Sequence, residues 1–413
     1  MVLMAAVGSC MFEEPGPLQL FEERMPVGDP LTASQKQALE GIYSFDVGSN
    51  DFGPMGVVKW NSREYMTVLT EKDISYFVLR AGQRDSVFFF EGYWQSQNSR
   101  RSGRASFRVP LEGGGRRLMG DSSVPSPVLL EGTVDEGEGG SSSPVVLRYR
   151  WPVRREVLER KFWVLAHRGG GKMSDPLPYS ENSVELILVS ERYGANGIEI
   201  DVRLTKDGVP ILYHDNTLNA RLVQKTPMLG PVEEYTFPQL RTSVRLLRGE
   251  LIPSLEEAFN AVVYRTNLKL VWLDLKTEGR DLISRIVPLV QEYTMQAAVL
   301  AEQGLRDTLE IMLGVPSDAI YDEILRYPSY TSLPTIAERS LDKARTLHSL
   351  VWAPVWSSGI CRADNATARS EGRRIFVWTL DDPHFTQEYV DSFEYDGILS
   401  DYPMIVAYYH YVQ

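Results

Sequence analysis

The chain has 413 residues, of which 43% are hydrophobic, and a formal net charge of −12. This length predicts more than one domain, and the acidity excludes duplex nucleic-acid binding, which needs a basic surface. Two cysteines, Cys10 and Cys361, are too few for a disulfide framework, so both are expected to be free of one. No run of 18 apolar residues occurs, so no segment is predicted to span a membrane.

Residues 1–35 read as a signal or tether segment. The stretch "MVLMAAVGSC" is apolar and small, ends at Cys10, and resembles the end of a bacterial lipoprotein signal peptide. A positively charged start and a full-length apolar region are missing from it. Two interpretations therefore stay open. In one, the protein is extracytoplasmic in a bacterium, either periplasmic or anchored to a membrane through a lipidated Cys10. In the other, the cysteine is incidental.

Residues 36–153 are predicted to form an all-β domain of unknown role. Short aromatic and β-branched runs alternate here with Gly, Asn, Asp and Ser, which is typical of an antiparallel sandwich or barrel. No helix is predicted in this half. No catalytic group is predicted either, because this half contains no histidine. The expected strands are 41–46, 55–60, 64–71, 74–81, 86–94, 103–110, 127–135 and 144–151.

Residues 154–413 follow a different pattern, in which apolar strands alternate with helices. Eight such strands predict a (β/α)₈ TIM barrel, an α/β fold. Residues 203–253 interrupt the alternation and are predicted to be an insertion after the second strand. The expected strands are 162–167, 197–202, 270–275, 309–314, 333–338, 350–356, 374–380 and 396–401, and the expected helices are 181–193, 254–264, 280–302, 317–326, 341–348, 364–371 and 384–395.

Three acids are candidate metal ligands at the carboxyl ends of these strands, where such barrels carry their chemistry. Glu199 and Asp201 are two apart in one strand, so their side chains share a face. Two neighbouring carboxylates repel each other unless they are neutralised. Asp274 adds a third acid from the next strand, and an all-oxygen set suits Ca²⁺ or Mg²⁺. The competing interpretation is a structural network with Arg203 and Lys276, but the third acid favours the metal.

Histidines and cations surround the predicted metal site. His167 ends the first barrel strand, and His214 ends an apolar run that follows the "KDG" turn. Such a pair can supply one base and one acid near neutral pH. Arg168 and Lys276 can bind an anion. Together these groups predict hydrolysis of a phosphodiester.

Seven motifs resemble the glycerophosphodiester phosphodiesterase family over residues 162–406. They are "HRGG" (167–170), "SENS" (180–183), "GIEIDVRLTKDGVPILYHD" (197–215), "IPSLEEAF" (252–259), "DLK" (274–276), "VWTLDD" (377–382) and "DGILSDYP" (396–403). The resemblance implies a barrel enzyme that uses Ca²⁺ or Mg²⁺ to hydrolyse glycerophosphodiesters to glycerol 3-phosphate and an alcohol.

The resemblance also implies roles for individual residues. Glu199, Asp201 and Asp274 would bind the metal, His167 and His214 would be the acid–base pair, and Arg168 and Lys276 would hold phosphate. Glu181 and Asn182 would line the site, and Trp378 would shape the alcohol or glycerol pocket. Asp274 stands where the family usually has Glu, which puts metal preference in question. Residues 216–231 also depart from the family pattern, which leaves the identity of the substrate open.

Two alternative functions remain at this point. One is a phospholipase of the C or D type that acts on intact lipid headgroups, although the three acids argue against the bacterial inositol-lipid enzymes. The other is a surface-binding protein in which the barrel is not catalytic. The expected partner is a small-molecule glycerophosphodiester, and the sequence does not indicate an oligomeric state. The remaining histidines, His348, His384 and His410, are expected to cap helices, face solvent or lie in the tail.

Overall fold

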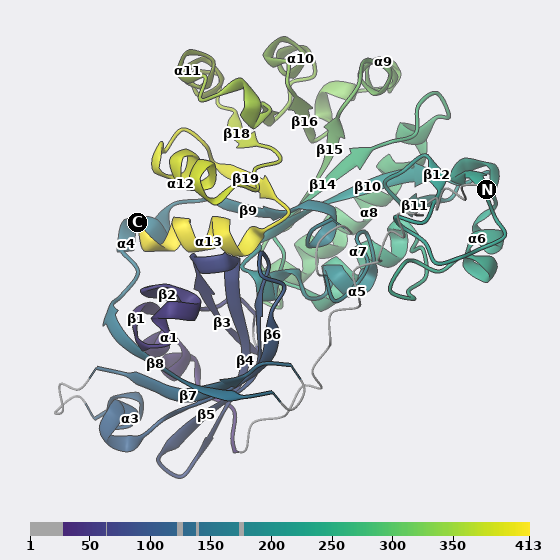
Figure 1. The fold of residues 1–413 in the computed structure, drawn as a ribbon. Helices are drawn as coiled ribbons and strands as arrows, with labels where there is room; N and C mark the ends of the chain where they lie inside the picture. Colours follow the sequence, from purple (N-terminus) through teal and green to yellow (C-terminus); the bar gives the residue numbers. More distant parts are fainter. Residues whose placement is uncertain (1–27, 63, 122–126, 138–139, 173–176) are drawn as a thin grey trace, which may run out of the picture.

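The structure is a computed structural model that describes residues 28–62, 64–121, 127–137, 140–172 and 177–413. Two closed barrels make up this part of the chain (Figure 1). No helix in these residues is long and apolar enough to cross a membrane. Cys10 lies outside the described residues, so its lipidation stays a prediction.

The first barrel consists of eight antiparallel strands, as predicted. Each strand pairs with the next, and the eighth pairs with the first to close the ring, which decides for a barrel over a sandwich. The strands are β1 (Gly41–Val47), β2 (Met55–Trp60), β3 (Tyr65–Thr70), β4 (Ser75–Arg84), β5 (Val87–Ser96), β6 (Ser102–Val109), β7 (Leu129–Asp135) and β8 (Ser142–Trp151).

Aromatic side chains fill the interior of this barrel. Phe52 lies in contact with Phe77 and Trp94, at ring-centroid distances of 4.8 and 5.3 Å. Phe52 comes from α2 (Ser49–Phe52), so the prediction that this half lacks helices is wrong. Two more short helices, α1 (Ala33–Leu39) and α3 (Gly115–Leu118), were also missed. Each spans only one or two turns, too short to give a helical hydrophobic period.

The second barrel has eight parallel strands, which confirms the predicted TIM barrel. Its ring closes because β9 pairs with both β19 and β10. The strands are β9 (Trp163–Ala166), β10 (Gly197–Leu204), β14 (Leu270–Leu275), β15 (Glu310–Val315), β16 (Thr335–Glu338), β17 (Val351–Ala353), β18 (Arg374–Val377) and β19 (Gly397–Ser400).

Helices cover this barrel between successive strands, and their ends carry the expected caps. Ser254 and Glu257 form a capping box at the start of α7 (Leu255–Arg265), and Asp382 caps α12 (Pro383–Asp391). The other helices are α4 (Arg155–Glu159), α8 (Leu282–Glu302), α9 (Asp318–Arg326), α10 (Leu341–Thr346) and α11 (Arg362–Ser370).

The single helix predicted for 181–193 is wrong. The chain forms only α5 (Val184–Ile187) and a 3₁₀ turn, η4 (Ser190–Tyr193). Asn182 has a left-handed backbone, with φ of 59°, and its side chain bonds to Asp201. The residues before α5 are therefore held in a turn by the site instead of beginning a helix.

The insertion after the second barrel strand contains β11 (Pro210–Leu212), β12 (Thr217–Leu218), β13 (Gly230–Pro231), the 3₁₀ turn η5 (Val232–Glu234) and α6 (Phe237–Ser243). The strand β11 lies antiparallel to the end of β10. A small apolar cluster of the insertion's own residues, including Tyr213, Leu222 and Leu240, holds it together.

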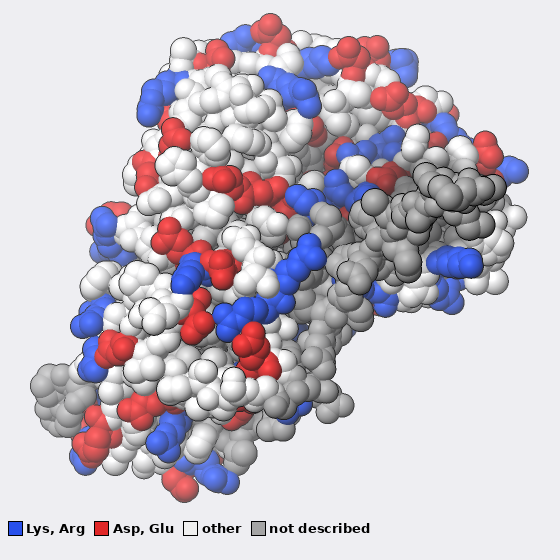
Figure 2. All heavy atoms as spheres, viewed as in Figure 1, with Lys and Arg blue, Asp and Glu red and all other residues white. Residues whose placement is uncertain are grey.

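The C-terminal helix α13 (Pro403–Val412) was not predicted, and it lies between the two barrels (Figure 1). Its Tyr409 hydroxyl donates to Glu71 of the first barrel at 2.9 Å. One apolar cluster includes residues of both barrels, such as Leu69 and Ile398. His410 is therefore not in a loose tail: it is buried and stacks on Phe162 at 4.6 Å. On the face seen in Figure 2, acidic and basic side chains are interspersed over both barrels.

Candidate active site

Three acids lie together inside the TIM barrel. Glu199 and Asp201 alternate on β10 with Ile198 and Ile200, which pack against the helices outside the barrel. Asp201 is paired in register with Asp274 on β14. One carboxylate oxygen from each acid lies within 4.8 Å of the other two. The two strands thus bring the predicted metal ligands to one point.

Each of the three carboxylates has a buried oxygen that could bind a cation. One buried oxygen of each, namely Glu199 Oε1, Asp201 Oδ1 and Asp274 Oδ1, has no hydrogen-bond partner. Burial, then the charge of Asp201, raises the pKa of Glu199 to about 8. Burial likewise raises the pKa of Asp274. An all-oxygen donor set of this kind suits a hard divalent cation.

Lys276 and Arg203, the cations of the structural alternative, behave differently. Lys276 Nζ lies 2.5 Å from Asp274 Oδ2 and 3.2 Å from Asp201 Oδ1. Burial lowers the pKa of Lys276, but the charges of Asp201 and Asp274 outweigh burial and raise it. Arg203 does not reach the acids, because it donates to Glu233 and to the backbone carbonyl of His214. One lysine therefore offsets only part of the negative charge.

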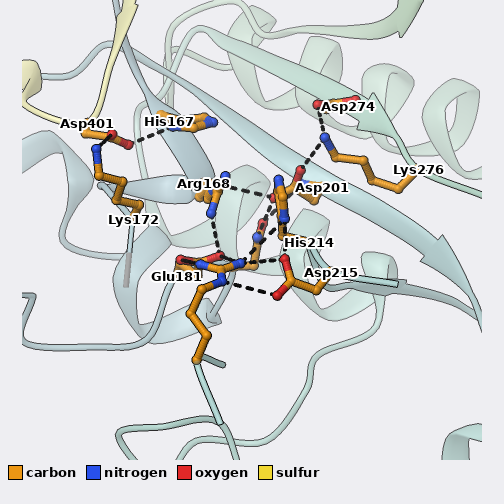
Figure 3. Close-up of polar contacts among 12 residues, drawn as sticks. His167, Arg168, Lys172, Glu181, Asp201, His214, Asp215, Asp274, Lys276 and Asp401 are labelled. Carbon is orange, nitrogen blue, oxygen red and sulfur yellow. Dashed lines mark hydrogen bonds and ion pairs between the residues drawn. The ribbon is translucent and has the colours of Figure 1, made fainter. Parts of the chain in front are cut away.

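His167 stands directly after β9 and is held by a carboxylate (Figure 3). Its Nδ1 lies 2.7 Å from Asp401 Oδ1, and its Nε2 lies 3.7 Å from Glu199 Oε2. Burial lowers the pKa of His167, but the bond with Asp401 and the charge of Glu199 together raise it to about 9. Lys172 Nζ in turn lies 2.8 Å from Asp401. These contacts therefore fix the orientation of the His167 ring and favour its protonated form.

His214 follows β11, and its surroundings have the opposite effect. Its Nδ1 lies 2.7 Å from Asp215 Oδ1, while its carbonyl accepts from Arg203 at 2.9 Å. Burial lowers the pKa of His214, and the pull of Asp201 in the other direction is smaller. Both histidines thus have a carboxylate on Nδ1, but the pKa is raised at His167 and lowered at His214.

Arg168 and the Glu181–Asn182 turn frame the acids from the β9 side. The Arg168 backbone N–H donates to Glu199 Oε2 at 2.9 Å, and its guanidinium donates to Glu181 at 2.8 Å. The Asn182 amide donates to Asp201 Oδ2 at 2.7 Å, and its oxygen accepts the Asp201 backbone N–H. The site residues expected from this turn therefore act by holding Arg168 and Asp201 in place.

Trp378 follows β18 on another wall of the barrel. Its indole N–H donates to the Ala353 carbonyl at 2.9 Å, and the ring is half-buried. The Arg339 guanidinium lies over this ring, 5.1 Å from its centroid. Trp378 is thus at the catalytic end of the barrel, with a cation against one of its faces.

Sequence reasoning missed several residues of the site. Asp401 ends one predicted strand and Arg339 follows another, so the strand-end rule that selected the acids could also have selected them. Asp215 is adjacent to His214 and could have been expected beside it. Arg221 bonds to Asp215 and Glu181 from within the insertion, where no pattern pointed to it. Other missed residues around the site are Lys172, Glu338 and Asp381.

The arrangement is that of a barrel hydrolase with an acidic metal-type centre and two histidines. Residues 167–405 match the model of the glycerophosphoryl diester phosphodiesterase family, so the chain belongs to this family. This confirms the resemblance seen in the motifs.

Individual relatives cover mainly the TIM barrel. A glycerophosphodiester phosphodiesterase of Caldanaerobacter subterraneus is 24% identical over 258 residues, which are 59% of this chain and 95% of the relative. Mouse glycerophosphodiester phosphodiesterase 1 is 37% identical over 120 residues, covering 27% of this chain and 33% of the mouse protein. A solved glycerophosphodiester phosphodiesterase from Parabacteroides distasonis is 21% identical with a TM-score of 0.43, covering 59% of this chain and 94% of that one.

Proposed function

We propose that this protein hydrolyses glycerophosphodiesters to glycerol 3-phosphate and an alcohol, with a bound Ca²⁺ or Mg²⁺. The observation that carries the proposal is the joint placement of three buried acids and two histidines, each histidine bonded through Nδ1 to its own carboxylate. The relatives from Caldanaerobacter subterraneus and mouse bear the name of this activity.

The proposed metal ligands are Glu199, Asp201 and Asp274, which have the unpartnered oxygens. A bound divalent cation would polarise the phosphoryl oxygens of the substrate. Asp274 reaches one methylene less far than the Glu usual in the family. The choice between Ca²⁺, which accepts flexible geometry, and Mg²⁺, which demands a tight octahedron, therefore depends on this residue.

The proposed acid and base are distinguished by their surroundings. With Nδ1 of each ring bonded to a carboxylate, Nε2 is the atom left for proton transfer. His214, whose pKa is lowered, is the neutral partner that takes the proton from the attacking oxygen. His167, whose pKa is raised, gives its proton to the alcohol oxygen as the phosphorus–oxygen bond breaks.

Arg168 and Lys276 are the cations nearest the acids, and we assign them to the phosphate. Arg168 has a planar guanidinium that can bond to two phosphoryl oxygens at once. Lys276 lies on the opposite flank of Asp201, at 3.2 Å. Their charges offset the negative charge that grows on the phosphoryl oxygens during the reaction.

The metal requirement gives the test of this proposal. Purified protein is incubated with glycerophosphocholine before and after EDTA treatment, and Ca²⁺ or Mg²⁺ is then added back. We expect activity to be lost with EDTA and restored by at least one of the two ions. Full activity in the presence of EDTA would contradict the metal-dependent mechanism.

A matched assay with intact phosphatidylcholine separates the phospholipase alternative. The proposal expects hydrolysis of the deacylated substrate and little or none of the intact lipid. Preference for the intact lipid would favour the phospholipase instead. The surface-binding alternative has less support, because one side of the first barrel packs against α13.

The proposal that Cys10 anchors the protein outside the cytoplasm is independent of the chemistry. Metabolic labelling with a fatty acid in a bacterial host would test it, with Cys10→Ser as the control. Absence of label on the native chain would reject the anchor.

A further inference from the structure

Arg339 stands at the catalytic end of β16 in a fixed backbone conformation. Its φ of 65° lies in the left-handed region, which a residue with a long side chain adopts only when its surroundings enforce it. Its N–H donates to the Ala353 carbonyl at 2.9 Å, and its carbonyl accepts from the Trp352 indole at 3.1 Å. Two bonds to β17 therefore set the direction in which this side chain leaves the strand.

The guanidinium of Arg339 is placed on an aromatic ring that is itself held. It lies 5.1 Å from the centroid of Trp378, whose indole N–H donates to the same Ala353 carbonyl. A cation over an indole face is attracted by the ring quadrupole. The pair is therefore pre-organised by a single backbone oxygen of the strand between them.

Arg339 differs from the other cations of the site in its charge balance. Arg168, Lys172, Arg221 and Lys276 each form an ion pair with a carboxylate. Within the described ranges, Arg339 has no ion pair or side-chain hydrogen bond. Arg339 does act electrostatically on the adjacent Glu338, a buried carboxyl whose pKa burial raises well above its usual range, but among the described residues its exposed guanidinium forms no ion pair.

The position of the pair relates it to one arm of a bound diester. In the ring of strands, β17 lies opposite β10, and β16 and β18 flank β17. A phosphate held by Arg168 and Lys276 on the β9, β10 and β14 side has one substituent facing that wall. Arg339 and Trp378 stand at the ends of the strands that flank β17 on that wall.

Resting on the proposed function, and on the alcohol or glycerol pocket that the family resemblance implies for Trp378, we propose that Arg339 makes this pocket select released alcohols that bear a second phosphate. A guanidinium offers paired donors to phosphate. Quaternary ammonium groups are bound by open aromatic faces, and here a cation that repels them lies against one face of Trp378. Choline is therefore a disfavoured alcohol.

The test compares three substrates on the full-length protein with its metal. They are glycerophosphoinositol 4-phosphate, glycerophosphocholine and the plain polyol diester glycerophosphoglycerol. We expect wild type to have the highest kcat/KM on the phosphorylated substrate. In Arg339→Gln, kcat/KM on that substrate should fall about tenfold, mainly through KM, as expected for one charge-assisted contact. Its kcat/KM on glycerophosphocholine should be unchanged or higher.

Arg326→Gln is the matched control. Like Arg339, Arg326 is an exposed arginine that forms no ion pair with the described residues. It ends α9, before β16 begins. This variant should keep the wild-type ratio between the substrates, and a Tm measured for each variant verifies folding. An unchanged ratio in Arg339→Gln would overturn the subsite while glycerophosphoglycerol is still hydrolysed. The proposed function itself would be overturned if wild type hydrolysed none of the three substrates.

Discussion

At the scale of the residue, the two histidines of the site differ in their affinity for a proton. Each is bonded through Nδ1 to a carboxylate, yet the pKa of His167 is raised and that of His214 is lowered. At His167 the bond with Asp401 and the charge of Glu199, 3.7 Å away, outweigh burial. At His214 burial dominates, and the charges of Arg168 and Lys276 also lower the pKa. Separated proton affinities of this kind are what an acid and a base in one site require.

The first prediction concerns these two side chains. His167→Ala and His214→Ala should each lower kcat on a glycerophosphodiester by roughly 100- to 10 000-fold, the range for loss of a general acid or base. The control is His348→Asn, because His348 is exposed after α10 with a left-handed φ of 54°, which Asn tolerates. Steady-state kinetics measure the effect, and near-normal kcat in either alanine variant would contradict the assignment.

The second prediction concerns the metal ligands. Asp274→Asn removes one charge from the three-acid set, and it should weaken Ca²⁺ or Mg²⁺ binding by more than the roughly 10- to 100-fold typical of losing an outer-shell partner. Isothermal titration of metal into EDTA-stripped protein measures this directly. An Asp318→Asn variant, exposed at the start of α9, is the control and should bind as wild type does. Equal affinity in all three proteins would remove Asp274 from the ligand set.

At the scale of the element, the hairpin after β10 depends on one arginine. Arg203 lies on β10 and donates to the carbonyl of His214 and to Glu233 of η5. It thereby fastens the end of β11 and the insertion to the barrel wall. Because Arg203 is mostly buried, its loss removes the side-chain donor to the His214 carbonyl and the ion pair with Glu233, which keeps its bond from Thr277.

The third prediction follows from this contact. Arg203→Met should destabilise the protein by about 3 kcal/mol, the cost of removing one partner of a buried pair, and should also lower kcat because His214 loses its anchor. Arg285→Met is the control, since Arg285 is exposed and, among the residues that the structure describes, donates only to the Gly208 carbonyl. It should change stability by less than about 0.5 kcal/mol. Urea unfolding gives the stabilities, and equal values for the two variants would contradict the role of Arg203.

Elements with a clear hydrophobic period were predictable, and those set by long-range contacts were not. All sixteen barrel strands were predicted because each is a short apolar run between turn residues. The helix at 181–193 was predicted wrongly because Asn182 is recruited by Asp201, a partner on another strand. The same reason hid Arg221, which reaches Glu181 across 40 residues at 3.0 Å.

The site was predictable where a strand ends in a polar residue of known chemistry. The acids and histidines satisfied that rule, and so did Asp401, whose role appears only when β19 lies beside β9. The competing interpretation paired Arg203 with the acids, but Arg203 bonds to Glu233 and the His214 carbonyl instead. Spacing along the chain fixed which residues share a strand, and only the fold fixed their partners.

At the scale of the whole molecule, α13 joins the two barrels. Its buried side chains belong to a core that also contains residues of β3 and β19. His410 is part of this joint, stacked on Phe162, and burial lowers its pKa to about 3. Its Nδ1 has no hydrogen-bond partner, so no hydrogen bond at this atom offsets the cost of burying the ring.

The fourth prediction is a loss of stability in acid. The folded pKa of His410 lies below the unfolded value of 6.5, so its contribution is complete above pH 6.5 and is lost as the pH falls toward 3. Between pH 7 and pH 5 this should cost about 2 kcal/mol in wild type, a cost that is absent in His410→Phe. Urea unfolding at both pH values measures the difference, with His348→Asn as the control. An equal pH effect in wild type and His410→Phe would contradict it.

The central claim is that the site at the carboxyl ends of the TIM-barrel strands hydrolyses glycerophosphodiesters by breaking the bond between phosphorus and the alcohol oxygen. Phosphorus NMR of the reaction with glycerophosphoglycerol and glycerophosphocholine, in the presence of Ca²⁺ or Mg²⁺, tests it most directly. We expect the wild-type protein to replace the diester signal with that of glycerol 3-phosphate, and we expect the diester signal to persist with His214→Ala. An unchanged diester with wild type, or phosphocholine as the product from glycerophosphocholine, would contradict the account.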